Sequence, residues 1–121
     1  MKTFGKLMDK LLNGSHERIC KLADREFDAI IELFNRKGKS YGANNDVFHN
    51  FRMTAIRLYG RDTWDAMFRV AEIYKDKHNV ALAKGIDVPE ARERLRDNIL
   101  YSLFQLAMID EYEKEEKSDC Y

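Results

Sequence analysis

An inward-facing lysine and an inward-facing histidine are the first residues of this sequence that could do chemistry. At about 100° per residue, Lys75 and His78 fall within the apolar stripe that Met67, Ala71 and Tyr74 define on a predicted helix. Burying either side chain costs free energy unless a partner satisfies it. One interpretation is a lysine that reaches solvent at the edge and a hydrogen-bonded core histidine. The alternative, of similar weight, is a cavity whose cations bind an anion.

A row of acidic residues and a tyrosine lies on a later predicted helix. Glu93, Asp97 and Tyr101 follow one another at intervals of four residues, so they share one face. An inward-facing aspartate needs a cation, and the simplest internal pair is Asp97 with Lys75. The functional alternative is that Glu93 and Asp97 present two carboxylates to one Mg²⁺ ion. The sequence makes no cofactor certain, and Mg²⁺ is the one expected if the protein is an enzyme.

The segment 38–45 (GKSYGANN) is the one long loop with two glycines that the sequence predicts. Glycines allow backbone N–H groups to turn toward a ligand, Lys39 adds positive charge, and Tyr41 could stack on a base. Gly42 belongs to the same loop, and Arg52 on the next helix could reach it. An ordinary interhelical loop stays the slightly favoured interpretation. The Gly-Lys-Ser triplet is no P-loop, because it follows a helix and lacks the required first glycine.

The composition limits the class of protein. The chain has 121 residues and a mass of 14.3 kDa, enough for one domain. Its 21 basic and 21 acidic residues balance, which argues against a nucleic acid polymer as partner. The sequence contains neither a signal-peptide pattern nor a membrane-spanning apolar run. Its two cysteines, Cys20 and Cys120, fit reduced thiols, so we expect a cytoplasmic protein.

The elements that must position these residues are helices. Apolar residues recur every three or four positions, and only one proline occurs, which predicts an all-α, single-domain bundle over 1–121. A short N-terminal helix and turn would occupy 1–14, and a charged tail 115–121. Gly38, Gly60 and Gly85 are expected stops, and Asp62 an expected helix cap. The bundle would contain about four to five helices, with approximate ranges 3–12, 16–37, 46–59, 63–84 and 87–114.

The last predicted helix has two apolar stripes on different sides of its cylinder. The first contains Leu95, Ile99, Leu103 and Leu106, and the second contains Leu100, Phe104, Ala107 and Met108. A helix that is apolar on two sides is either central in its own fold or covered by another subunit. We therefore expect a homo-oligomer.

Several short motifs in a fixed order resemble a known family. The order is Lys39-Ser40-Tyr41-Gly42, then Phe48-His49-Asn50-Phe51, then Lys75, then Arg94-Leu95-Arg96-Asp97-Asn98-Ile99-Leu100-Tyr101. Over about residues 27–112 the chain resembles phage-encoded proteins of the nucleotide modification associated domain type 1 family. That family is distantly similar to the all-α nucleotide pyrophosphohydrolases of MazG type.

The resemblance implies a nucleotide pocket but an incomplete set of metal ligands. The pyrophosphohydrolases hold Mg²⁺ with a Glu-x-x-Glu and a later Glu-x-x-Asp. Here Asp97 matches the final acid, Arg94 replaces the preceding glutamate, and 16–37 contains no Glu-x-x-Glu. In a retained pocket, Lys75 and His78 would contact phosphate, Tyr41 or Tyr101 would stack on the base, and Asp97 would accept from base or sugar. The expected ligand-binding residues are Lys39, Tyr41, Gly42, Arg52, Lys75, His78, Asp97 and Tyr101.

Three functions are compatible with these residues. The first is binding of a phosphorylated or cyclic nucleotide without turnover, which would sequester a signal of host defence or serve nucleotide modification. The second is a Mg²⁺-dependent nucleoside triphosphate pyrophosphohydrolase, which needs converging acids and a metal-activated water. The third is a non-catalytic helical interaction module. We favour the first, with a nucleotide-type small molecule as partner and, for a viral protein, the host cytoplasm as its location.

Overall fold

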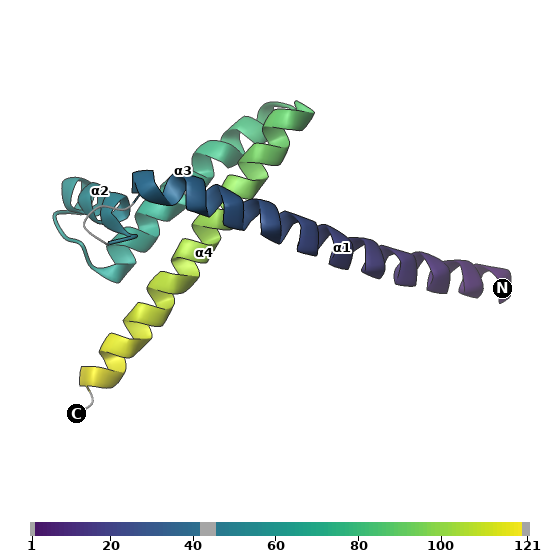
Figure 1. The fold of residues 1–121 in the computed structure, drawn as a ribbon, viewed down its shortest axis with the longest axis horizontal. Helices are drawn as coiled ribbons and strands as arrows, with labels where there is room; N and C mark the ends of the chain where they lie inside the picture. The colour runs from purple at the N-terminus through teal and green to yellow at the C-terminus, as the bar shows by residue number, and fades with distance from the viewer. Residues whose placement is uncertain (1, 42–45, 120–121) are drawn as a thin grey trace.

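Helices form all of the regular structure in the described part of the chain. The computed structural model describes the backbone of residues 2–41 and 46–119, and the side chains of residue 6 and of residues 14–37 and 46–117. The helices are α1 (Lys2–Tyr41), α2 (His49–Tyr59), α3 (Trp64–Lys84) and α4 (Val88–Asp119), as Figure 1 shows. The expected all-α class is confirmed. Among the described residues, no helix combines the length and apolar character needed to cross a membrane.

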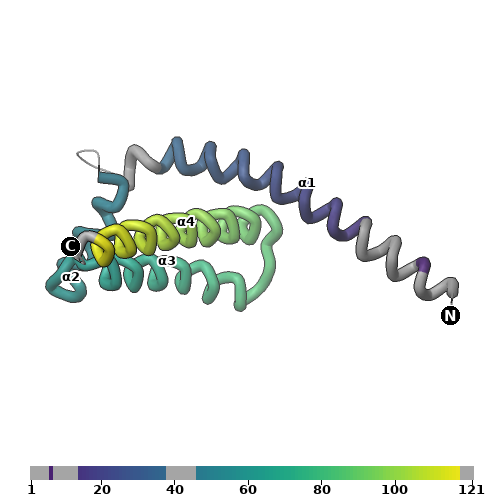
Figure 2. The backbone as a smooth tube through the Cα atoms, turned by 90° about the horizontal axis from the view of Figure 1, so that it is seen from below, coloured from purple at the N-terminus to yellow at the C-terminus, as the bar shows by residue number. Residues whose placement is uncertain are grey.

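A hairpin of α3 and α4 is the centre of the fold. α3 ends at Lys84 and α4 begins at Val88, so the short connection returns the chain antiparallel to itself. The two helices lie side by side in both views (Figures 1 and 2). Pro89 occupies the first turn of α4, where the missing N–H costs no helical hydrogen bond, as the sequence predicted.

The short helix α2 packs against α3 and ends at Gly60, the expected stop. Gly60 has the left-handed backbone conformation (φ 72°), and its N–H donates to the Ile56 carbonyl at 2.8 Å. A residue with a Cβ would be strained at that φ, so glycine suits this helix end.

The core lies where α2, α3 and α4 meet. Phe51 and Ala55 of α2 contribute fully buried side chains. From α1, Ile30 and Leu33 are buried, and Phe34 packs against the same cluster. The other buried apolar residues are Ala66, Met67, Val70, Ala71, Leu100, Tyr101, Phe104 and Met108.

The long helix α1 crosses α4 and then projects away from the hairpin (Figures 1 and 2). Its C-terminal half packs on α4, whereas no side chain of residues 14–25 is buried. At about 1.5 Å per residue, the 40 residues of α1 span about 60 Å. Within the described side chains, the N-terminal part of the helix therefore buries nothing against its own chain.

Several expected helix boundaries are wrong. The predicted helices 3–12 and 16–37 are one continuous helix, because an interior glycine such as Gly14 costs only about 1 kcal/mol relative to alanine. This helix includes residues 38–41 of the predicted loop, so Gly38 is no stop. α2 begins at His49 rather than near residue 46, and α4 runs into the predicted tail, to Asp119. Asp62 does not cap α3: Thr63 takes the cap position, and Asp62 accepts from Arg52 at 3.1 Å.

Candidate functional site

A polar pocket of about 360 Å³ opens where α2, α3 and α4 come together. Two residues one turn apart on α2, three on α3 and two on α4 line it. The set combines an amide, three hydroxyls, an ammonium, an imidazole and a carboxylate, which are the groups that bind small polar ligands. The residues of the polar pocket are Asn50, Thr54, Tyr74, Lys77, His78, Asp97 and Tyr101.

Aromatic rings form one wall of the polar pocket. The His78 imidazole stacks on the Tyr101 ring at 6.1 Å between centroids with an interplanar angle of 24°. The Tyr74 ring lies 5.7 Å from that of Tyr101, and its hydroxyl is 3.1 Å from Thr54 Oγ. Phe51 packs behind both tyrosines at 5.8 and 6.3 Å. Packing from behind holds the wall rigid, so a ligand would meet preformed ring surfaces.

A chain of charges borders the aromatic wall. Asp97 is mostly buried, and its Oδ1 accepts from Lys37 Nζ of α1 at 2.9 Å. Its Oδ2 lies 3.6 Å from His78 Nε2. On the other side of the ring, Arg94 Nη1 lies 3.0 Å from His78 Nδ1, and Arg94 also pairs with Glu90 at 2.7 Å. Both imidazole nitrogens thus face fixed polar groups.

These contacts keep His78 neutral. Burial lowers the pKa of His78; Asp97 opposes this shift, and the positive charges of Arg94, Lys77 and Lys37 add to it. A guanidinium can only donate, so Nδ1 accepts from Arg94 and the ring proton lies on Nε2, toward Asp97. His78 therefore serves as a neutral wall of the pocket rather than as a second cation.

The neutral histidine predicts a specific pH dependence of stability. The unfolded chain takes up a proton on His78 below pH about 6.5, whereas the folded protein resists it, so acid favours the unfolded state. We expect the free energy of unfolding to fall as the pH drops through about 6.5, by at most about 1.4 kcal/mol per pH unit for this proton. Urea unfolding of wild type and His78→Gln between pH 7.5 and 5 measures the difference. Equal slopes in the two proteins would contradict the assignment.

Lys77 is the cation of the polar pocket that remains available. Its side chain is exposed at the rim and forms no ion pair with any described residue. Lys37, by contrast, is held by Asp97, and Arg94 is held by Glu90. An anionic ligand would therefore meet the Lys77 ammonium without first breaking an ion pair.

The structure brings together three of the eight expected ligand-binding residues, namely His78, Asp97 and Tyr101. Lys75 is not among the lining residues: its ammonium donates to Gln105 at 3.0 Å and to Glu72 at 3.2 Å. The expected Asp97–Lys75 pair does not form, because Lys37 of α1 reaches Asp97 instead.

Arg52 lies outside the polar pocket. Its guanidinium pairs with Asp46 at 2.9 Å and with Asp62 at 3.1 Å, and it covers the Trp64 ring at 5.7 Å. Arg52 thus connects the segment before α2, through Asp46, to the loop after α2, through Asp62. The backbone of Lys39 and Tyr41 belongs to the end of α1, while the side chains of both residues and the whole of Gly42 lie outside the described part of the chain.

Basic side chains surround the two residues proposed for Mg²⁺. Glu93 and Asp97 line a second hollow together with Arg36, Lys37 and Arg96, so cations already occupy their surroundings. Glu26 of α1 does not contribute: a hydrogen bond from Arg96 lowers its pKa and holds the carboxylate in that pair. Among the residues that the structure describes, no group of three or more histidine, cysteine or acidic side chains is placed to bind a metal.

The sequence did not predict four of the residues that line the polar pocket, namely Asn50, Thr54, Tyr74 and Lys77. The spacing of these residues along α2 and α3 could have indicated them. Tyr74, Lys77 and His78 stand at i, i+3 and i+4, so they share one face of α3, as Asn50 and Thr54 do on α2. The spacing shows which residues share a face but leaves open which face meets the neighbouring helix.

Comparisons with family models, with curated proteins and with solved structures gave no match. The polar pocket and its contacts are therefore the basis for the function proposed below.

Proposed function

We propose that the polar pocket binds a phosphorylated nucleotide without turning it over. One observation carries the proposal: the aromatic wall of Tyr74, His78 and Tyr101 stands beside the Lys77 ammonium, which pairs with none of the described residues. A nucleotide combines a flat aromatic base with an anionic phosphate, so it can use both features at once. Base stacking on aromatic side chains contributes about 1–3 kcal/mol per base in other proteins.

Three polar residues of the pocket have a natural part in such a complex. Lys77 would donate to a phosphate oxygen. The Asn50 side chain offers both a donor and an acceptor, which suits the edge of a base. Asp97 would accept from a base N–H or a ribose hydroxyl, and its ion pair with Lys37 reduces its repulsion of the phosphate.

Binding is favoured over hydrolysis because the acidic residues are engaged by cations. A pyrophosphohydrolase needs several carboxylates around Mg²⁺ to activate water. Here Asp97 pairs with Lys37 and Glu26 pairs with Arg96, and Arg94 stands where the resembling enzymes have glutamate. A binding protein of this kind would sequester a nucleotide signal, including one of host defence, or serve nucleotide modification.

A thermal-shift screen tests the proposal directly. The panel contains nucleoside triphosphates and monophosphates, cyclic dinucleotides and cyclic ADP-ribose-type molecules, each with and without Mg²⁺. At a concentration of about 100 times Kd, a ligand should add about 2.7 kcal/mol to the free energy of unfolding and raise Tm. Pyrophosphate released from a hit in the presence of Mg²⁺ would identify an enzyme instead. A folded protein with no hit would favour the helical interaction module.

Lys77→Ala should weaken the binding of a hit by about 10- to 100-fold, because a charge-assisted hydrogen bond contributes about 1.5–3 kcal/mol. Isothermal titration calorimetry measures the change in Kd. Lys84→Ala is the matched control: it removes the same charge from another exposed position of α3 and should leave Kd unchanged. Wild-type affinity in Lys77→Ala would show that the ligand binds elsewhere.

A further inference from the structure

A large apolar surface is left uncovered where α1 crosses α4. Eight large apolar side chains on these two helices are between 39% and 62% exposed. We call this set the α1/α4 apolar surface. Its members are Ile19, Leu22, Phe27 and Ile31 of α1 and Leu95, Ile99, Leu103 and Leu106 of α4. Single exposed apolar residues are normal on a protein surface, but eight of them on two packed helices mark a contact.

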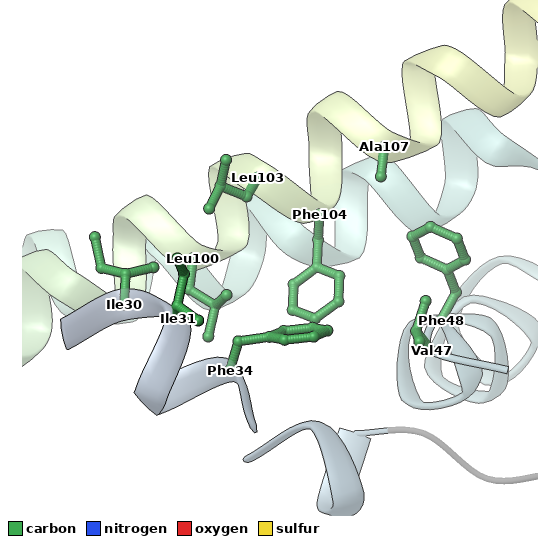
Figure 3. A pocket seen from close by; sticks show the side chains of 9 residues that line it. All are labelled: Ile30, Ile31, Phe34, Val47, Phe48, Leu100, Leu103, Phe104 and Ala107. Carbon is green, nitrogen blue, oxygen red and sulfur yellow. The ribbon is translucent and has the colours of Figure 1, made fainter. Parts of the chain in front are cut away.

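Two hollows deepen this surface beside the helix crossing. The first, of about 300 Å³, contains Ile31 and Leu103, and apolar side chains alone line it (Figure 3). The second, of about 380 Å³, contains Leu22, Leu95 and Ile99. Apolar hollows of this kind suit the side chains of a helix, whereas a phosphorylated ligand would find no polar partner in the first of them.

The projecting half of α1 has no cover of its own. From residue 14 to residue 25, Ala23 alone is half-buried and the other described residues are exposed. Ile19, Ala23 and Phe27 continue the stripe that contains Ile30 and Leu33, at intervals of three and four. An isolated helix is marginally stable in water, so an apolar stripe along a projecting helix calls for a partner surface.

We propose that a second copy of this chain covers the α1/α4 apolar surface, with the two α1 helices exchanged across a two-fold axis. Each copy has a projecting helix without a hairpin beneath it and an α4 face without a helix above it. The C-terminal half of α1 shows how α1 packs on α4, since Ile30 and Leu33 are buried there. In a dimer with a two-fold axis, the projecting helix of each copy would cover the exposed α4 face of the other, and the interface would be self-complementary.

The area of the α1/α4 apolar surface and the net charge of the chain are both compatible with a second copy as the partner. Eight side chains, each about half exposed, offer on the order of 800 Å² with their flanking atoms, which is what each partner of a stable complex buries. The projecting residues 2–21, which precede the hollow that Leu22 shares with α4, span about 30 Å, enough to cross two helices packed about 10 Å apart. The formal net charge is zero, so two copies do not repel each other.

Sedimentation velocity and light scattering of the full chain give the first test. Wild type should have twice the mass of one 14.3 kDa chain. The double variant Phe27→Glu/Ile31→Glu should have the mass of one chain and stay helical, because both side chains are more than half exposed in the single chain. The control, Ile73→Glu/Val80→Glu, changes two equally exposed residues of α3 outside the surface and should remain a dimer.

Hydrogen exchange distinguishes exchanged α1 helices from another kind of dimer. Amides of residues 14–25 should be protected in wild type and exchange at least tenfold faster in the monomeric variant. If Phe27→Glu/Ile31→Glu fails to fold, Leu106→Glu tests the same surface from α4, where the side chain is 58% exposed.

Four results would overturn the proposal: a wild-type monomer, an assembly larger than two, dissociation by the control variant, or equal exchange of residues 14–25 in both proteins. None of them bears on nucleotide binding, which the thermal-shift screen tests separately.

Discussion

Phe104→Asp should abolish the fold rather than separate subunits. The Phe104 side chain is 5% exposed, and its ring lies 5.1 Å from Phe51, 5.8 Å from Phe34 and 6.3 Å from Phe48. Removing a buried phenylalanine costs about 3–5 kcal/mol, and an unpaired buried carboxylate adds several more. The total approaches the whole stability of a small domain, about 5–15 kcal/mol. Circular dichroism should show no cooperative thermal transition.

Ile73→Asp is the control for this experiment, because it places the same charge on a side chain that is 49% exposed on α3. It should keep the helicity and the unfolding transition of wild type. A folded, monomeric Phe104→Asp protein would mean that the stripe of Leu100, Phe104 and Met108 belongs to an interface. The structure instead places that stripe in the core and leaves the stripe of Leu95 and Leu106 exposed.

Phe51→Ala should destabilise the protein by about 3–5 kcal/mol, because it opens a cavity among rings that cannot collapse freely. Phe51 is fully buried and contacts Tyr74, Tyr101 and Phe104 from α2. The two tyrosines form the aromatic wall of the polar pocket, so the affinity for a nucleotide should fall as well. Urea unfolding gives the free energy of unfolding, and calorimetry gives Kd.

The comparison for Phe51→Ala is Met53→Ala on the same helix. Met53 is 46% exposed, and truncating it should cost no more than about 0.5 kcal/mol. A cost below about 1 kcal/mol for Phe51→Ala would contradict the burial of Phe51 in the core. A large loss of stability with unchanged nucleotide affinity would show that Phe51 supports the core without holding the aromatic wall.

Helix positions were the most predictable feature of the chain. Apolar periodicity located α2, α3 and α4 to within a few residues, and the expected stop at Gly60 is confirmed by its left-handed conformation. Periodicity is a local property, which explains this success. The same local rules failed at Gly14 and Gly38, because a glycine weakens a helix without deciding whether it ends.

The polar pocket was less predictable, for a geometric reason. The sequence identified His78, Asp97 and Tyr101, which share the pocket, but paired Asp97 with Lys75. In the structure Asp97 pairs with Lys37, sixty positions earlier in the chain, because α1 crosses α4 at that point. The spacing of residues within one helix gives no information on the angle at which another helix crosses it.

By itself, the sequence determined the all-α class, the approximate helix ranges and which residues share a face on each helix, because short-range geometry governs these properties. The tertiary structure alone decided which face each helix buries. It placed Lys77 rather than Lys75 in the polar pocket and left the α1/α4 apolar surface open. Burial depends on helix crossing, and crossing is set by the packing of side chains that are distant in the chain.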